Sequence, residues 1–163
     1  MGLLRGNGIV TDDEWTIVRD EEGEAQLPNG PVAVTLGRWR AQRDALLGRG
    51  TSVGVILAAT DCVGSIVEDL GSLELVCVDF PKFTDGRGYS HARLLRDRYR
   101  YKGEVRAIGD VLRDQLFFMK RCGFDAFQVR DDKDVEDALA AFGEFSVTYQ
   151  ADAEGRRPIY RHG

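Results

Sequence analysis

The chain has 163 residues, of which 43% are hydrophobic and 30% are charged, and it carries a net charge of −5. This length suits one domain, and the composition excludes a mainly disordered chain. No apolar run approaches the roughly 20 residues that cross a bilayer, and the N-terminus lacks the apolar core of a signal peptide, so we expect a cytoplasmic protein without a membrane partner.

The sequence divides into three parts. Residues 1–30 form an acidic, loop-like segment in which we expect one strand, at Trp15–Val18. Residues 31–150 are predicted to form a single α/β domain, and residues 151–163 a polar C-terminal tail.

Strands and helices alternate through the middle part. Strands are predicted at Val32–Leu36, Val53–Leu57, Leu73–Val78, Glu104–Ile108, Phe124–Val129 and Phe145–Tyr149. Helices are predicted at Arg38–Leu47, from about Asp61 to Leu70, at Tyr89–Tyr99, at Asp110–Cys122 with Asp110 as its N-cap, and from Asp131 or Asp132 through Phe142. This alternation predicts right-handed crossovers and a mostly parallel sheet of five or six strands, either open or closed into a partial TIM-like barrel.

In sheets of this kind, ligands bind beyond the carboxyl ends of the strands. Four predicted loops lie at that edge: Thr60-Asp61, Asp79–Gly88, Gly109-Asp110 and Arg130–Asp132. The second loop has the composition of an oxyanion site, because its glycines let a ligand approach the main chain and its cations suit phosphate, sulfate or sulfite. The predicted anion-binding residues are Lys82, Gly86, Arg87, Gly88, Ser90 and Arg113.

Three residues near this loop are candidates for proton transfer: Asp79, Asp85 and His91. The two carboxylates could instead orient the cations of the loop. A lone histidine is more often structural than catalytic, and the whole segment also fits a plain glycine turn whose aspartates cap a helix.

Charge is distributed unevenly along the chain. Residues 82–130 contain twelve Lys and Arg against six Asp and Glu, a net charge of +6, whereas the remainder carries −11. This segregation predicts a positive patch that faces an anion or an acidic partner. The low isoelectric point, about 5.1, and the lack of an aromatic-rich recognition motif argue against a nucleic-acid partner.

Two features of this basic region suggest a protein interface. Helical periodicity places Arg93, Arg96 and Arg100 together on one face of the Tyr89–Tyr99 helix, which is either a solvated face or a docking surface. Phe117 falls among charged residues of the next helix, where it is either an interface anchor or covered by a neighbouring helix.

The cysteines and histidines do not predict a metal site. Cys62, Cys77 and Cys122 are widely spaced, and the sequence has neither a CxxC pair nor a Cys–His cluster. Because all three cysteines lie in apolar segments, we expect buried, unreactive thiols.

Two long runs carry a resemblance to a known family. The sequences FPKFTDGRGYSHARLLRDRY (80–99) and GEVRAIGDVLRDQLFFMKRCGFDAFQVR (103–130) resemble the bacterial domain-of-unknown-function family 934. The positions that match the motifs of that family are Phe80, Pro81, Lys82, Phe83, Asp85, Gly86, Arg87, Gly88, Ser90, Arg93, Gly109, Asp110, Arg113, Asp114 and Gln115.

The resemblance implies a role in assimilatory sulfite reduction in bacteria, because genes of this family commonly lie beside the sirohaem sulfite or nitrite reductase gene. Members often carry an oxidoreductase label. The sequence shows no nicotinamide fingerprint, no iron–sulfur ligand set and no redox CxxC, so it assigns no cofactor and no catalytic roles.

We therefore expect a non-catalytic accessory protein that docks to sulfite reductase or to its electron donor. One alternative is a small enzyme that binds an oxyanion at the Asp79–Ser90 loop. Another is a structural protein that forms a homodimer across the end of the sheet.

Overall fold

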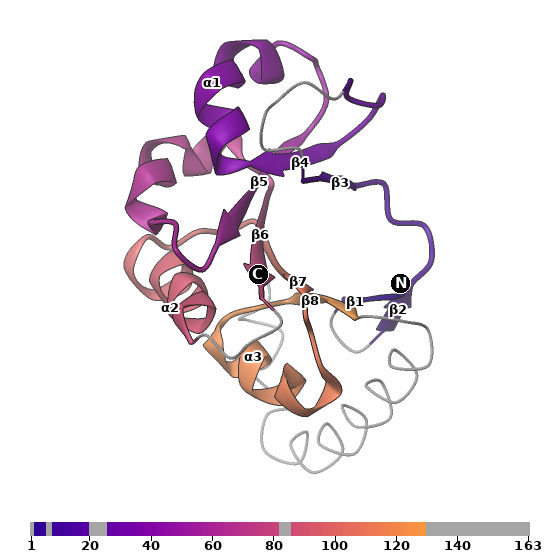
Figure 1. The fold of residues 1–163 in the computed structure, drawn as a ribbon, viewed down its shortest axis with the longest axis vertical. Coiled ribbons are helices and arrows are strands. Elements are labelled where there is room, and N and C mark those ends of the chain that lie inside the picture. The colour runs from indigo at the N-terminus through magenta and orange to yellow at the C-terminus, as the bar shows by residue number, and fades with distance from the viewer. Residues whose placement is uncertain (1, 6–7, 20–25, 82–85, 130–163) are drawn as a thin grey trace.

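The computed structural model describes residues 2–5, 8–19, 26–81 and 86–129 (Figure 1). In this part of the chain, eight strands form one sheet in the order β2-β1-β8-β7-β6-β5-β4-β3. The strands are β1 (Gly2–Arg5), β2 (Gly8–Val10), β3 (Thr16–Val18), β4 (Val32–Thr35), β5 (Val53–Ala58), β6 (Leu75–Phe80), β7 (Glu104–Gly109) and β8 (Ala126–Val129). The helices are α1 (Leu36–Leu47), the 3₁₀ helix η1 (Val63–Ser72), α2 (Arg87–Arg93), the π-helix η2 (Leu94–Arg98), the 3₁₀ turn η3 (Arg113–Gln115) and α3 (Leu116–Cys122).

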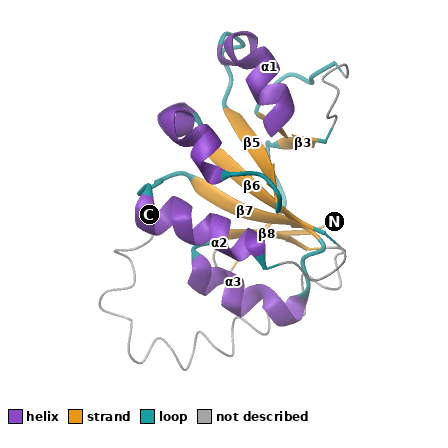
Figure 2. Ribbon diagram, turned by 60° about the vertical axis from the view of Figure 1, so that its left-hand side comes forward, coloured by secondary structure: helices purple, strands orange, loops and turns teal. Residues whose placement is uncertain are grey.

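The predicted mostly parallel sheet built from repeated strand–helix units is confirmed. Strands β3 to β8 lie side by side in chain order and are all parallel. Successive crossovers of one hand carry the helices to one face of such a sheet, and Figures 1 and 2 show this arrangement around a curled sheet. The sheet is open, since β2 and β3 are its two edges.

The expected number of strands was too low, because β1 and β2 were missed. These strands are four and three residues long and pair antiparallel with each other, and β1 also pairs antiparallel with β8, which follows it by more than a hundred residues. Segments this short carry too little alternation to predict a strand. The expected strand near Trp15 is present as β3, whereas the predicted helix and strand between residues 131 and 149 and the tail at 151–163 lie outside the described residues.

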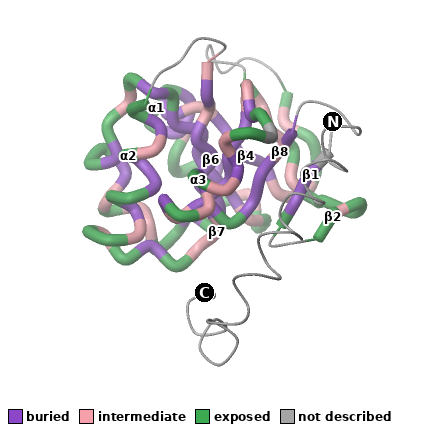
Figure 3. The backbone as a smooth tube through the Cα atoms, turned by 90° about the horizontal axis from the view of Figure 1, so that it is seen from below, coloured by how far each residue is buried: buried purple, intermediate pink, exposed green. Residues whose placement is uncertain are grey.

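The central strands form because both of their faces are covered. The larger core lies between the sheet and the helices and includes Val55, Val76, Val78 and Trp39. Figure 3 shows the buried central strands beneath helices whose outer sides are exposed. On the other face, a smaller cluster of Ala33, Ile56, Leu75, Cys77 and Ile108 packs against Trp15 and Ile17 of the N-terminal segment.

Three predicted helices differ in detail from the structure. The helix after β5 is a 3₁₀ helix, and the last turn of the helix after the Asp79–Ser90 loop is a π-helix, in which the Tyr99 N–H donates to the Leu94 carbonyl at 3.0 Å. Helix α3 begins at Leu116, so Asp110 does not cap it. The Asp110 N–H instead donates to the Phe80 carbonyl at 2.9 Å and extends the pairing of β7 with β6.

Among the described residues, no helix has both the length and the apolar character needed to cross a membrane.

Candidate functional site

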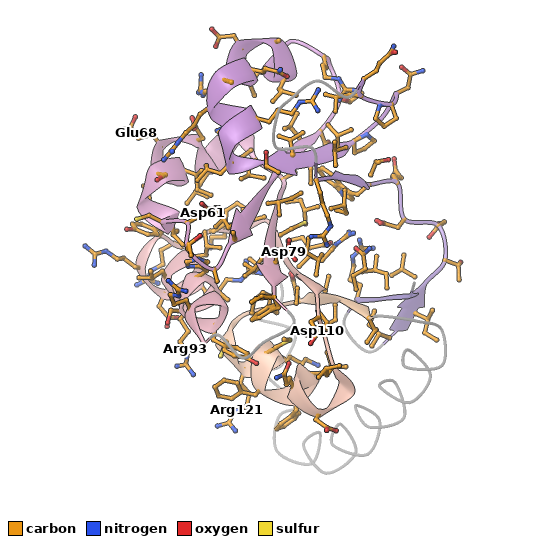
Figure 4. All side chains as sticks on the ribbon, in the orientation of Figure 1. Asp61, Glu68, Asp79, Arg93, Asp110 and Arg121 are labelled. Carbon is orange, nitrogen blue, oxygen red and sulfur yellow. The ribbon has the colours of Figure 1, made fainter. Side chains whose placement is uncertain are left out.

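The carboxyl ends of β6 and β7 bring two predicted positions together. Asp79 lies near the end of β6, where its half-buried carboxylate forms an ion pair with Arg19. Gly109, at the end of β7, has φ = +90°, and a Cβ there would collide with the Asp79 carboxylate and the Phe80 carbonyl. Only glycine suits this position, because any side chain would be strained and would displace Asp79. Figure 4 labels Asp79 on β6 and Asp110, which directly follows β7.

The glycines and cations of the predicted anion loop have different environments. Lys82 and Asp85 lie outside the described residues, and Arg113 lies in η3. Arg87 and Ser90 are exposed on α2, and a Cβ at Gly86 would meet no atom within 4 Å. Gly88 is different, because its Cβ would lie 2.6 Å from the ring of Phe80. The missing side chain of Gly88 therefore lets α2 pack on β6, which explains this glycine without a ligand.

His91 has a structural environment. Its side chain is buried, and Nε2 lies 3.0 Å from the backbone carbonyl of Ala58 at the end of β5. Because a carbonyl only accepts hydrogen bonds, this ring nitrogen carries the proton. The bond ties α2 to β5, and the geometry gives no support to the predicted role in proton transfer.

The predicted arginine ridge is divided by the π-helix. Arg93 and Arg100 are exposed, but the Arg96 guanidinium is turned toward the protein. Its nitrogens donate to the backbone carbonyls of three residues and form an ion pair at 3.2 Å; these partners are Gly123 (2.9 Å), Tyr101 (2.9 Å), Gly103 (2.8 Å) and Asp125. A π turn holds more residues than an α turn and so rotates the later side chains about the helix axis. Arg96 thus connects η2 to the segments that flank β7 and β8, and the prediction that places it on the exposed ridge is wrong.

The exposed aromatic residue of α3 is Phe118. Phe117 was expected to be either an interface anchor or covered by a neighbouring helix. Phe118 is 47% exposed and Phe117 is half-buried. The ring of Phe118 packs edge-on against Tyr89 of α2, with the centroids 5.0 Å apart, and the Arg93 guanidinium lies 5.8 Å from the Phe118 centroid. Two helices therefore share one exposed aromatic and cationic contact.

This contact is connected to the core by a row of rings. Tyr89 packs against Phe80 of β6 at 5.2 Å, and Phe80 packs against Phe124 at 5.7 Å. Phe124 is only 2% exposed. The row thus runs from the buried side of the sheet to the surface, and it holds Phe118 in a defined place.

A shallow hollow lies beside the same contact and is lined by Ser90, Arg93, Leu94, Asp97 and Arg98. We call the hollow together with Phe118 the α2–α3 surface. Between residues 87 and 121 the described chain exposes six cations (Arg87, Arg93, Arg98, Arg100, Lys102 and Arg121) and two acids (Asp97 and Asp114), a net charge of +4. In Figure 4, Arg93 and Arg121 point outward on the same side of the molecule.

Residues 54–160 match a family of bacterial proteins of unknown function, DUF934. The chain belongs to this family. No curated protein matches the sequence. The DUF934 match begins in β5 and includes α2, η2 and α3, so the whole α2–α3 surface lies inside the region that defines the family.

Sequence reasoning missed three residues of this DUF934 protein that the structure places at prominent positions: Arg19, Leu94 and Phe118. Phe118 and Leu94 were not singled out, because uninterrupted α-helices were predicted at Tyr89–Tyr99 and Asp110–Cys122. Arg19 carried no local signal, since its partner Asp79 lies 60 residues away in the sequence.

Among the described residues, no group of three or more His, Cys, Asp or Glu side chains is placed to hold a metal ion.

Proposed function

We propose that this DUF934 protein is a non-catalytic accessory protein of assimilatory sulfite reduction. It docks through the α2–α3 surface to sulfite reductase or to the electron donor of that enzyme. The resemblance in the sequence supplies the pathway, and the exposed surface supplies the docking site.

The observation that carries the proposal is the Arg93–Phe118 contact on a basic surface. Interfaces are enriched in arginine and aromatic residues, which supply most of the binding energy. The net charge of +4 on the exposed side chains between residues 87 and 121 favours encounter with an acidic protein, although the whole chain is acidic.

The test is a pull-down of the tagged protein from extract of its own cells at low salt, followed by mass spectrometry. We expect sulfite reductase or its electron donor to be recovered by the wild type, and less of it by Arg93→Glu and Arg98→Glu. Arg40→Glu is the matched control, because Arg40 is also an exposed helical arginine but lies on α1. Arg96 is unsuitable for charge reversal, since its loss would destabilise the fold.

Salt supplies an independent check. At about 0.1 M salt the screening length is about 10 Å and at about 1 M it is about 3 Å, so docking that depends on exposed charges weakens as salt rises. If recovery of the partner were unchanged by both charge reversals and by high salt, the electrostatic account would be wrong.

One observation favours the alternative function, an enzyme that binds an oxyanion at the Asp79–Ser90 loop. Arg19 is brought to the carboxyl end of β6 and adds a cation that the sequence did not place there. Calorimetric titration with sulfite, sulfate and phosphate tests this alternative, and Arg19→Gln and Arg87→Gln should abolish any heat of binding.

The homodimer, the other alternative, is tested by light scattering coupled to gel filtration, where a strict monomer would exclude it.

A further inference from the structure

We propose that Arg93, Leu94 and Phe118 form a preorganised anchor for an acidic segment of a partner protein that carries a large apolar side chain next to a carboxylate. This inference rests on the proposed docking function and names the chemistry of the docked segment. The docked segment must carry both a negative charge and an apolar side chain, because the anchor offers both a cation and exposed apolar groups.

Arg93 is the link between the two halves of the anchor. Its side chain lines the hollow together with Leu94, and its guanidinium also lies over the ring of Phe118. Leu94 is 36% exposed and Phe118 is 47% exposed, so both are among the large apolar side chains that the described surface leaves in water. A partner that covered them would bury apolar area on both sides of one arginine.

The charge of the surroundings selects an acidic partner. Arg98 also lines the hollow, and Asp97 is the one acidic residue among the five that line it. Further exposed cations along the same part of the chain are Arg87, Arg100 and Arg121. A carboxylate that reached Arg93 would gain a charge-assisted hydrogen bond. It would displace no salt bridge to another described residue, because the Arg93 guanidinium lies over the aromatic ring of Phe118. Phe118 would still hold the guanidinium from behind.

The anchor is held in place before the partner binds. The ring row from Phe124 through Phe80 and Tyr89 supports Phe118 from the core. The π-helix that begins at Leu94 fixes the position of Leu94 and Arg98 relative to α2, and such irregular turns occur frequently at functional sites. Rigid groups lose little conformational entropy on binding, so a few contacts here would contribute more to affinity than the same contacts on a flexible surface.

The test measures binding of fluorescently labelled probes, two peptides and a polysaccharide, to the full chain by fluorescence anisotropy at low salt. The probes are a twelve-residue oligoglutamate, a peptide of the same length in which four of the glutamates are replaced by leucine, and heparin as a polyanion without apolar groups. We expect the Glu/Leu peptide to bind about tenfold or more tightly than oligoglutamate, which corresponds to one decade of Kd. Leu94→Ala and Arg93→Gln should each remove most of this difference.

Two control variants match the chemistry of the anchor. Leu47→Ala removes a leucine of equal exposure from α1, and Arg40→Gln removes an exposed arginine from the same helix, so neither should change the affinity. Phe118→Ala is a further variant, and circular dichroism checks that it stays folded because its ring packs on Tyr89. Equal affinity for the two peptides, tighter binding of heparin, no binding of the Glu/Leu peptide, or equal losses in the control variants would each overturn the inference.

The same variants separate this inference from the proposed function. If Leu94→Ala and Phe118→Ala captured sulfite reductase as well as the wild type did, the anchor would be wrong while the accessory role stood. If the Glu/Leu peptide required the anchor but no sulfite-reduction protein were captured, the chemistry of the surface would stand and its assignment to this pathway would fail.

Discussion

A buried arginine makes the attachment of the N-terminal segment a testable feature of the fold. The Arg106 side chain on β7 is fully buried on the sheet face opposite the helices. Its guanidinium donates two hydrogen bonds to the Asp13 carboxylate, at 3.0 and 3.1 Å, and forms an ion pair with Glu104 at 2.8 Å. Burial opposes the charge of Arg106, but the hydrogen bonds to Asp13 and the negative charge of Glu104 outweigh it and raise the pKa of Arg106. The arginine therefore stays charged and depends on its partners.

The perturbation is Asp13→Asn. It removes one negative charge and leaves a single side-chain oxygen to accept from Arg106. Removing one partner of a buried ion pair costs about 3–5 kcal/mol when the remaining charge is uncompensated. Here Glu104 remains, and the Asp13 side chain is 23% exposed, so solvent reaches part of the pair. We expect the free energy of unfolding to fall by about 2–3 kcal/mol, in the range of charge-assisted hydrogen bonds.

The assay is urea denaturation followed by circular dichroism, where a lower midpoint at unchanged slope reports lost stability. Asp12→Asn is the control, because Asp12 is the exposed neighbour in the same segment. The double variant Asp13→Asn with Arg106→Met should recover part of the loss, since an apolar side chain needs no counter-charge. A loss for Asp13→Asn within about 0.5 kcal/mol of that for Asp12→Asn would refute the reasoning, because differences of that size are usual for exposed positions.

Three further outcomes follow from individual contacts. Arg96→Ala should lower the free energy of unfolding by about 2–4 kcal/mol, because it leaves backbone carbonyls without a charged donor, whereas Arg93→Ala should change it by less than about 0.5 kcal/mol; equal losses in urea denaturation would contradict this difference. Cys62 is exposed, so the expectation that all three cysteines are buried is wrong for this residue. In native protein at pH 8, a thiol reagent should modify Cys62 and leave Cys77 intact, because burial raises the pKa of Cys77 to about 12; mass spectrometry showing Cys77 modified before unfolding would disprove it. Gly88→Ala should lower the free energy of unfolding by about 1–3 kcal/mol, because the added methyl group overpacks against the ring of Phe80, and it should not change the affinity for sulfate. Lost anion affinity at unchanged stability would show instead that Gly88 belongs to a ligand site.

Local pattern predicted the repeating part of the fold well. Strands such as β5 and β6 are apolar at nearly every position because both of their faces are covered, and this property can be read from the sequence alone. Gly48 and Gly123 follow α1 and α3 directly, at the position where glycine commonly ends a helix. The same local signals predicted β3. The resemblance of two long runs indicated the family to which the chain belongs.

What the sequence could not decide depends on contacts between distant residues or on the exact phase of a helix. The strands β1 and β2 owe their existence to β8, which follows them by more than a hundred residues, so no local pattern marks them. The π-helix adds residues to one turn and thereby directs Arg96 into the protein while Arg93 stays exposed, although periodicity places both on one face. Sequence alone thus determined the parallel part of the sheet and the basic region, because these depend on composition and short-range spacing. Only the tertiary structure decided which cations and which aromatic ring face solvent, because exposure depends on what the rest of the chain packs against each side chain.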